Sequence, residues 1–184
     1  MSVRPVRIYG DPVLRQKAAE VGEFDAELQQ LAQDLRETMQ AYNGVGLAAN
    51  QIGVSQRIAV VDVPLDDDTR AAFTLVNPVI VERSGSETGE EGCLSIPAMY
   101  EDVTRSLKIR VSAHDETGKP YEVEAEGYLA RAIQHEIDHL DGVLFIDRLS
   151  PLRRQFLKRA LDALARGELP EGYSPPVGPA GGSR

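Results

Sequence analysis

The sequence predicts an α+β protein in which mostly antiparallel strands lie between N-terminal helices and a C-terminal helix. Three observations predict this class. Apolar residues recur at helical spacing in 25–42, and they do so again in 128–140 and 152–165. Between the first two of these segments lie short runs rich in β-branched residues, separated by turn residues. Because these runs follow one another without intervening helices, we expect antiparallel pairing.

The helices carry start and stop signals. A proline at the first helical position opens a short helix over 12–15 and the helix over 152–165, the latter directly after the capping residue Ser150. Gly44 follows the first long helix and Gly142 follows the helix over 128–140, where a C-terminal cap belongs. The stripe that the first long helix is expected to bury comprises Leu28, Leu31, Ala32, Leu35, Met39 and Tyr42.

Five strands are predicted in the middle of the chain. They cover 57–63, 73–76, 79–83, 107–113 and 121–125. The residues Asp-Glu-Thr-Gly at 115–118 are suited to the hairpin connection between the last two strands. His114 stands beside this connection, and we expect its side chain to be exposed.

Composition limits the class of protein. The 184 residues suit a single domain over 1–169 and a flexible, proline- and glycine-rich tail over 170–184. A net charge of −9 argues against a general nucleic-acid binder. No apolar run is long enough for a membrane span, and the first 20 residues lack the apolar stretch of a secretory signal. The single cysteine excludes an intramolecular disulfide and fits a reducing compartment, so a cytoplasmic location is expected.

The segment 134–140, Gln-His-Glu-Ile-Asp-His-Leu, contains the pattern His-Glu-x-x-His on a predicted helix. Residues four apart on a helix lie only about 40° apart around its axis, so His135 and His139 can reach one metal ion. Glu136 lies about 100° from His135, where it can contact a water on the metal without ligating the metal. We therefore expect the sheets to pack around a central metal-binding helix. The alternative is that both histidines are ordinary hydrogen-bonded core residues.

A catalytic metal site with an open position needs a third protein ligand. The best candidate is Cys93, because a thiolate binds soft and borderline metals tightly and this cysteine follows Gly92 in a glycine-flanked segment. The alternative for Cys93 is a small buried apolar residue. No histidine follows His139, and the downstream carboxylates lie near a helix end, on the last helix or in the tail: Asp141, Asp147, Asp162, Glu168 and Glu171.

Three segments, in this order, resemble the signature segments of the peptide deformylase family. They are 44–51 (Gly-Val-Gly-Leu-Ala-Ala-Asn-Gln), 91–95 (Glu-Gly-Cys-Leu-Ser) and 134–139 (Gln-His-Glu-Ile-Asp-His). The likeness runs from about Val6 to Ala165. It implies a hydrolase that removes the N-formyl group from the initiator methionine of new polypeptides and releases formate.

The resemblance also implies the parts of the site. Cys93, His135 and His139 would ligate a divalent ion, typically Fe²⁺, for which Zn²⁺, Ni²⁺ or Co²⁺ can substitute, with water at the fourth position. Gln51 and the backbone N–H of Leu94 would bind the formyl oxygen as it becomes an oxyanion. A carboxylate placed like Glu136 can take the proton of the attacking water and give it to the leaving amine. Glu91 and Arg105 resemble the buried pair that steadies the cysteine segment in this family.

Substrate selection is expected from an apolar pocket for the methionine side chain. The glycines at 44 and 46 allow close backbone approach, so an extended peptide can add to a strand edge there. Most of the candidate pocket residues would fit a core equally well. The candidates for substrate binding are Gly44, Val45, Gly46, Leu94, Tyr128, Ala132 and Ile133.

The expected partners are N-formylmethionyl nascent peptides, with no membrane and no specific DNA. The last helix carries a basic face formed by Arg153, Arg154, Lys158 and Arg159. One hypothesis is that this face docks on ribosomal RNA near the exit of nascent chains, as this region does in some family members. The alternative is a solvated helix face.

Other function classes use the same residues differently. An HExxH-type zinc metallopeptidase would take its third ligand downstream of His139 and would tolerate serine at Cys93. A non-catalytic metal-binding module would need a fourth protein ligand and would not need Glu136. A covalent mechanism would use Cys93 as a nucleophile paired with His135, and its activity would survive chelation.

Overall fold

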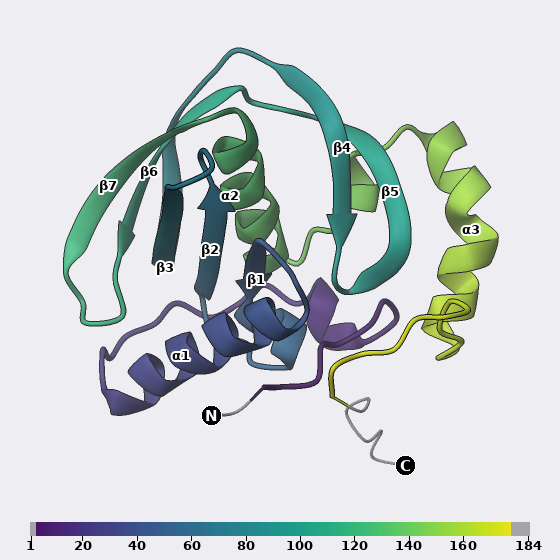
Figure 1. Cartoon of the computed structure of the whole chain (residues 1–184), viewed down its shortest axis with the longest axis horizontal. Coiled ribbons are helices and arrows are strands. Elements are labelled where there is room, and N and C mark those ends of the chain that lie inside the picture. The colour runs from purple at the N-terminus through teal and green to yellow at the C-terminus, as the bar shows by residue number, and fades with distance from the viewer. Residues whose placement is uncertain (1–2, 178–184) are drawn as a thin grey trace.

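The computed structural model of the chain describes residues 3–177 and confirms the α+β class (Figure 1). The helices in this part of the chain are α1 (Ala26–Ala41), α2 (Gly127–Leu140) and α3 (Pro151–Ala165), with short 3-10 turns at Pro12–Arg15, Ala49–Ile52 and Phe145–Arg148. The strands are β1 (Gly46–Ala48), β2 (Ile58–Pro64), β3 (Arg70–Ser84), β4 (Glu87–Cys93), β5 (Ile96–Arg105), β6 (Lys108–His114) and β7 (Pro120–Glu126).

The strands form two antiparallel sheets on either side of α2. Five strands pair in the order β1-β2-β3-β6-β7, so β1 lies at one edge, and β4 pairs with β5 as a separate hairpin. Figure 1 shows α2 between the larger sheet and this hairpin, with α1 across one end of the sheet and α3 beyond the hairpin. The central helix is therefore enclosed by elements that are distant in sequence.

The first long helix forms as its sequence indicates. The side chain of Asp25 accepts a hydrogen bond from the Leu28 amide at 2.9 Å and caps the N-terminus. The predicted stripe is buried except for Tyr42, which is half-buried and follows the last helical residue. Asn43, with a φ of 55°, ends the helix in the left-handed region just before β1.

Two expectations about the strands are corrected. The segments 73–76 and 79–83 belong to one long strand, β3, in which a bulge accommodates Asn77 at a φ of 50°. The Asn77 side chain replaces the lost ladder by exchanging two hydrogen bonds of 2.9 Å with the backbone of Val21. The hairpin of β4 and β5 was not predicted, because its first strand reads Glu-Thr-Gly-Glu-Glu-Gly-Cys and shows no apolar alternation.

His114, expected to be exposed, is half-buried. Its ring lies 5.5 Å from the ring of Phe24, centroid to centroid, in a tilted arrangement. The hairpin connection therefore packs against the segment that precedes α1, and this contact depends on chain sections too far apart for a local pattern to predict.

The central helix is buried on nearly every side. Its apolar arc, which includes Leu129, Ile133 and Ile137, packs into a core cluster with β2, β3, β6 and β7. Its polar arc, which includes Arg131, Gln134 and Asp138, is buried as well, and each of these side chains is at most 8% exposed. This arc faces the β4–β5 hairpin, where charged partners replace water.

The last helix begins at Pro151, with the Ser150 side chain accepting a hydrogen bond from the Arg153 amide at 3.2 Å. Leu161 and Leu164 anchor it in a second core cluster that also contains Phe145 and Ile96. Within residues 3–177, no helix combines the length and apolar character that crossing a bilayer requires. Of the expected tail, 170–177 is described and 178–184 lies outside the described residues.

Candidate active site

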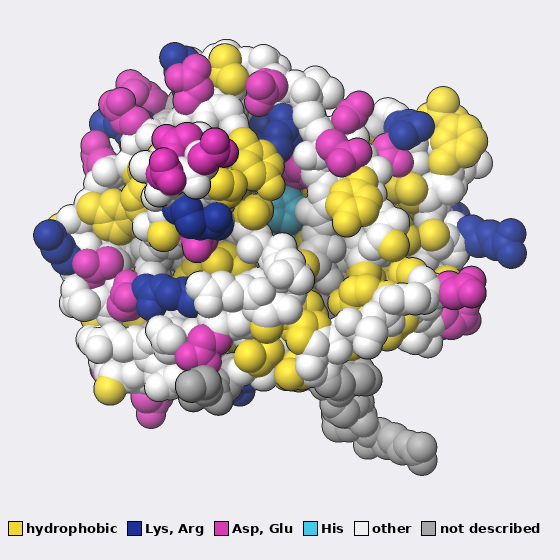
Figure 2. Space-filling view, viewed as in Figure 1, with side chains coloured by type: hydrophobic (Ala, Val, Ile, Leu, Met, Phe, Trp, Pro, Cys, Tyr) yellow, Lys and Arg dark blue, Asp and Glu magenta, His cyan; other side chains and the backbone are white. Residues whose placement is uncertain are grey.

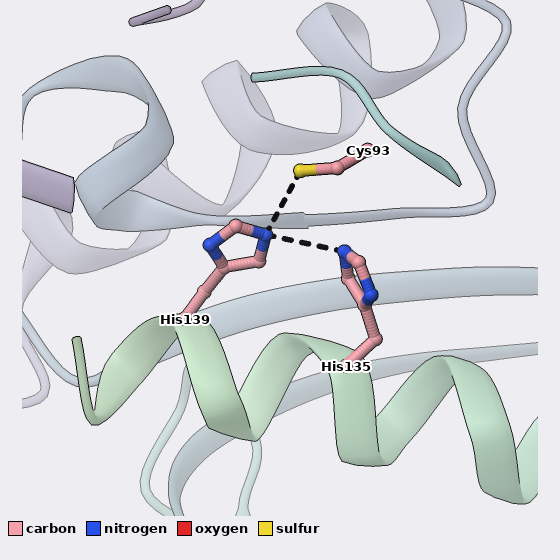
Figure 3. Close-up of side chains that lie close together, drawn as sticks. All are labelled: Cys93, His135 and His139. Carbon is pink, nitrogen blue, oxygen red and sulfur yellow. Dashed lines mark hydrogen bonds between the residues drawn. The ribbon is translucent and has the colours of Figure 1, made fainter. Parts of the chain in front are cut away.

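The two histidines of α2 meet the cysteine at the end of β4. The Cys93 sulfur lies 3.2 Å from Nε2 of His139, and this nitrogen lies 3.2 Å from Nε2 of His135. Figure 3 shows both rings rising from one face of the helix toward the sulfur. The three ligand atoms all lie within 4.8 Å of one another. The β4–β5 hairpin thus places the Cys93 sulfur next to the imidazole rings of His135 and His139 on α2.

This arrangement fits a metal ion better than it fits a hydrogen-bonded core. Ligands placed about 2.0–2.3 Å from a tetrahedral ion lie roughly 3.3–3.7 Å apart. The two distances of 3.2 Å from Nε2 of His139, to the Cys93 sulfur and to Nε2 of His135, are close to this range. The spacing of i and i+4 on a helix brings two imidazoles side by side without bending the backbone. One sulfur and two ring nitrogens leave a fourth position for water or substrate, as in catalytic sites.

A buried carboxylate orients the first histidine. Nδ1 of His135 donates a hydrogen bond to Oε2 of Glu91 at 3.0 Å, which leaves Nε2 free for a metal. Burial opposes ionisation of Glu91, but hydrogen bonds from Arg105 and His135 lower the pKa of Glu91 to about 2. Although burial acts in the other direction, hydrogen bonds with Cys93 and Glu91 raise the pKa of His135. Burial and the neighbouring His135 lower the pKa of His139.

Two arginines complete this buried charge network. Arg105 binds both carboxylate oxygens of Glu91 at 2.7 and 2.8 Å, and Arg131 donates to Oε1 at 2.9 Å. Arg105 also donates to Asp138 of α2 at 2.5 Å. Bidentate pairs of this kind fix geometry as well as charge. The network ties the cysteine hairpin to the histidine helix, and so sets the distance between sulfur and imidazoles.

Glu136 lies on the same helix, buried at 3% exposure. Its Oε2 atom has no hydrogen-bond partner within residues 3–177, and the side chain lines the cavity beside His135. Burial raises the pKa of Glu136 to about 7, while a dipositive ion close by would act in the opposite direction. A carboxylate in this position is suited to exchange a proton near neutral pH.

The segment after β1 supplies an amide donor. Oε1 of Gln51 accepts a hydrogen bond from the Ala48 amide at 2.9 Å, and this contact orients the side chain. Nε2 then donates to the Ser95 hydroxyl at 3.2 Å and to the Cys93 sulfur at 3.6 Å. The adjacent Asn50 donates to the carbonyl oxygen of His139. The N–H groups of Gln51 therefore point toward the group formed by Cys93, His135 and His139. The contacts of Gln51 with Ala48 and Ser95 hold the side chain in this orientation.

A cavity of about 700 Å³ opens onto these groups. Figure 2 shows a hollow in the middle of the face, with a histidine side chain at its base. Gly44, Val45 and Gly46 form part of one wall, and Tyr128 and Ala132 lie on the helix side. Leu94 and Gln51 also line it.

One of the expected pocket residues is placed elsewhere. Ile133 is fully buried in the core cluster behind α2 and is not among the residues that line the cavity. A rotation of about 100° per residue separates it from Ala132, so neighbouring helical residues face different surroundings. Ile133 therefore belongs to the core and not to the cavity wall.

Sequence reasoning missed several lining residues. Tyr42, Tyr100 and Tyr173 come from the end of α1, from β5 and from the C-terminal segment, and all three line the cavity. Ser95, which holds Gln51, is fully buried. The sequence carried no local signal for the tyrosines, because their proximity depends on how the hairpin and the C-terminus fold back.

The three downstream aspartates form ion pairs away from Cys93, His135 and His139. Asp141 pairs with Arg57 at 2.7 Å, Asp147 pairs with Arg15, and Asp162 pairs with Lys158 at 2.5 Å. Within residues 3–177, the group of metal-ligating side chains that converges is Cys93, His135 and His139. An HExxH-type peptidase with a downstream third ligand is therefore not supported. The fold and this site are typical of a metal-dependent hydrolase: one cysteine and two histidines could hold a metal ion, and a buried glutamate lies beside them.

Comparisons with known proteins specify the family. The model of the polypeptide deformylase family matches residues 3–155. A peptide deformylase of Alkalilimnicola ehrlichii is 49% identical over 166 residues, which cover 90% of this chain and 93% of that protein. The crystal structure of a Thermus thermophilus peptide deformylase superposes with a TM-score of 0.82 at 50% identity, covering 91% of this chain and 98% of that one. An Ehrlichia chaffeensis peptide deformylase in complex with actinonin gives 0.84 at 36% identity, covering 92% and 100%.

The chain belongs to the peptide deformylase family. It is an enzyme that removes the N-formyl group from the initiator methionine of newly made polypeptides, and it acts as a metal-dependent hydrolase.

Proposed function

We propose that Cys93, His135 and His139 hold one divalent ion, Fe²⁺ in the cell, and that Glu136 moves the protons of the reaction. The observation that carries this proposal is the convergence of three ligand atoms within 4.8 Å beside a buried carboxylate. The same ligands suit Zn²⁺, Ni²⁺ and Co²⁺. When bound, such an ion makes water a strong nucleophile at neutral pH and polarises a carbonyl group.

Side chains and backbone groups of the chain carry out proton transfer and stabilise the negative charge that develops on the formyl oxygen. Glu136 accepts a proton from the attacking water and delivers it to the amine nitrogen as the C–N bond of the formyl amide breaks, which yields formate and a free amine. Nε2 of Gln51 and the backbone N–H of Leu94 donate to the oxygen that gains negative charge. Neutral donors fixed in advance suit this role because they need no reorganisation during the reaction.

The peptide is proposed to enter along the edge of β1 that is not paired with β2. This strand is at the end of the sheet order, and its Gly46, together with Gly44 and Val45, lines the cavity. An extended peptide can pair there as an added strand. Tyr128 and Ala132, one helical turn apart, offer an apolar surface for the methionine side chain.

The metal is tested by elemental analysis of protein prepared with and without air. We expect about one iron per chain and high activity after anaerobic preparation, and loss of both in air, because Fe²⁺ and a thiolate ligand are open to oxidation. Equal iron content and equal activity from both preparations would contradict iron as the native ion. Activity that persists after complete chelation would instead support a covalent role of Cys93.

We propose that α3 docks on ribosomal RNA through its basic face, in the cytoplasm, with 1–169 acting as one catalytic unit. Arg154 and Arg159 are exposed and have no ion-pair partner within residues 3–177, whereas Arg153 pairs with Glu101 at 2.5 Å and Lys158 pairs with Asp162 at 2.5 Å. Unpaired cations are the ones available to phosphates, and such binding weakens steeply with salt.

Pelleting with ribosomes across a salt series tests this docking. Charge reversal of Arg154 and Arg159 to Glu is expected to abolish salt-sensitive binding. The control is Lys108→Glu on β6, an exposed lysine outside α3 that pairs with Glu126 at 3.0 Å. Equal binding by the double variant and the control would contradict the proposal.

A further inference from the structure

The chain beyond α3 returns to the mouth of the catalytic cavity. Figure 1 shows this segment running from the end of α3 back toward the end of α1. Most of its described residues line the same cavity as Cys93, His135 and Glu136. They are Pro170, Glu171, Gly172, Tyr173, Ser174 and Pro176.

Two turns and the anchored end of α3 determine the path of this segment. At the end of α3, Gly167 has a φ of 83° and its amide donates to the Leu164 carbonyl at 2.8 Å, which reverses the chain. A second turn follows at Gly172, with a φ of 77°, where the Tyr173 amide donates to the Pro170 carbonyl at 3.0 Å. Because Leu161 and Leu164 are buried in the core, the starting point of the segment cannot drift.

Tyr173 is the residue of this segment best placed to contact a peptide. It is half-buried, and burial together with the neighbouring Tyr42 raises the pKa of Tyr173. Tyr42 itself precedes the Asn43–Gly46 wall and accepts a hydrogen bond from the Val6 amide at 3.2 Å. Tyr173 therefore adjoins the β1 side of the cavity, on the route of a peptide paired with that strand.

The exposed charges around the cavity are acidic. Glu90 on β4 and Glu171 are both exposed and line it, whereas the lining Arg131 is buried and bound to Glu91. A cavity rimmed by uncompensated carboxylates attracts cationic side chains and repels acidic ones. The family model ends at residue 155, so Glu171 and Tyr173 lie outside the region that it matches.

We propose that 170–176 forms the outer wall of the peptide cleft, and that Tyr173 and Glu171 determine preference for the residues that follow formyl-methionine. This inference rests on the deformylase activity at the same site. Tyr173 packs on the substrate backbone and side chains beyond the second residue, and Glu171 favours a lysine or arginine there. For peptides too short to reach this wall, we expect kcat and KM to be independent of it.

Steady-state formate release is measured on formyl-Met-Ala and on two tetrapeptides, formyl-Met-Ala-Lys-Ala and formyl-Met-Ala-Glu-Ala. The test variants are Tyr173→Ala in the full chain and a chain stopped after Leu169. A chain stopped after Val177 is the matched control, because it keeps the whole wall. For charge, Glu171→Gln is compared with Glu168→Gln, since Glu168 pairs with Arg166 and is not among the cavity-lining residues.

For the lysine tetrapeptide, we expect Tyr173→Ala and the Leu169 stop to raise KM about five- to tenfold with kcat unchanged. The dipeptide kinetics should stay within about twofold, and the Val177 stop should behave as the full chain. Glu171→Gln should reduce the lysine-over-glutamate preference, which Glu168→Gln should leave intact.

Three results would overturn the inference. Unchanged KM for the tetrapeptides would show that the wall makes no contact. An equal rise in kcat/KM for all peptides would show that the segment obstructs the cleft. An equal fall for all peptides with loss of bound metal would show that it only supports the fold. If the full chain releases no formate from any formyl peptide, the assigned activity itself fails, which is a separate outcome.

Discussion

Gly46 on β1 and Glu136 on α2 touch so closely that no side chain fits between them. A Cβ atom at position 46 would lie 2.8 Å from the carboxyl carbon of Glu136 and would overlap its Oε1 atom. The backbone of β1, along which the peptide is proposed to bind, thus forms the surface that contacts the proposed general base. This contact fixes the distance between Gly46 and the Glu136 carboxylate. A reaction at the first residue of a peptide bound along β1 requires such a fixed distance between the peptide and the general base.

Gly46→Ala should therefore displace the Glu136 carboxylate while leaving the fold intact, because a side-chain end can move where a backbone cannot. A displacement of about 1 Å can cost about 10²-fold in rate. We expect a loss of that order in kcat with metal content unchanged. Gly22→Ala is the control, since a Cβ at Gly22 meets nothing within 4 Å. Equal kcat for both variants would show that the contact does not position the base.

Glu136→Gln should retain the metal and lose turnover. The amide is nearly isosteric with the carboxylate but cannot accept the proton of the attacking water. General acid–base catalysis typically contributes about 10²–10⁴-fold, so kcat should fall by at least that factor. Metal per chain and formate release are measured on the same preparation. Full activity in this variant would rule out Glu136 as the base.

Gln51→Ala should slow the reaction without releasing the metal. Loss of one donor to a developing oxyanion typically costs about 10²–10³ in kcat. The control is Asn50→Ala, whose side chain donates to the His139 carbonyl rather than toward the cavity. If Gln51 only supports the loop, both variants should lose thermal stability and rate to a similar degree, and the oxyanion assignment would be wrong.

Glu91→Gln should weaken metal binding and the fold together. The variant removes the carboxylate that Arg105 and Arg131 share and leaves Arg105 paired with Asp138 alone. Removing one partner of a buried ion pair typically costs about 3–5 kcal/mol. It also weakens the contact that fixes the His135 ring, which typically lowers metal affinity about 10–100-fold. Thermal unfolding and metal titration measure the two effects. Glu90→Gln, at the exposed neighbouring position on β4, should change neither.

Contacts in this site between residues close in sequence can be predicted from the sequence, whereas contacts between distant segments cannot. Four-residue spacing on one helix is enough to place His135 beside His139. The position of Cys93 against them depends on a hairpin from a different part of the chain. Thiolate chemistry made Cys93 the best candidate for a third ligand, and the resemblance to a family supported that choice. Apolar spacing, together with start and stop residues, predicted the bounds of α1 and α3 to within two residues, because both signals are local.

Burial of charge is the feature that local patterns describe least well. Arg131 and Asp138 look like surface residues on the polar arc of α2, and they are buried only because Arg105 and Glu91 arrive from the β4–β5 hairpin. The return of Tyr173 to the cavity is similar in kind. A segment with several prolines and glycines is predicted to be a flexible tail from its composition alone. Its course depends on the anchoring of α3 in the core and on the turns at Gly167 and Gly172, which only the structure shows.

One sulfur and two imidazole nitrogens are proposed to hold the catalytic ion. X-ray absorption at the metal edge of the anaerobically prepared enzyme measures these ligands, with Cys93→Ser prepared and measured in the same way. We expect one sulfur at about 2.3 Å and two imidazoles at about 2.0–2.1 Å, with the sulfur signal absent from the variant. A spectrum of the unaltered enzyme that contains only nitrogen and oxygen ligands would contradict this proposal.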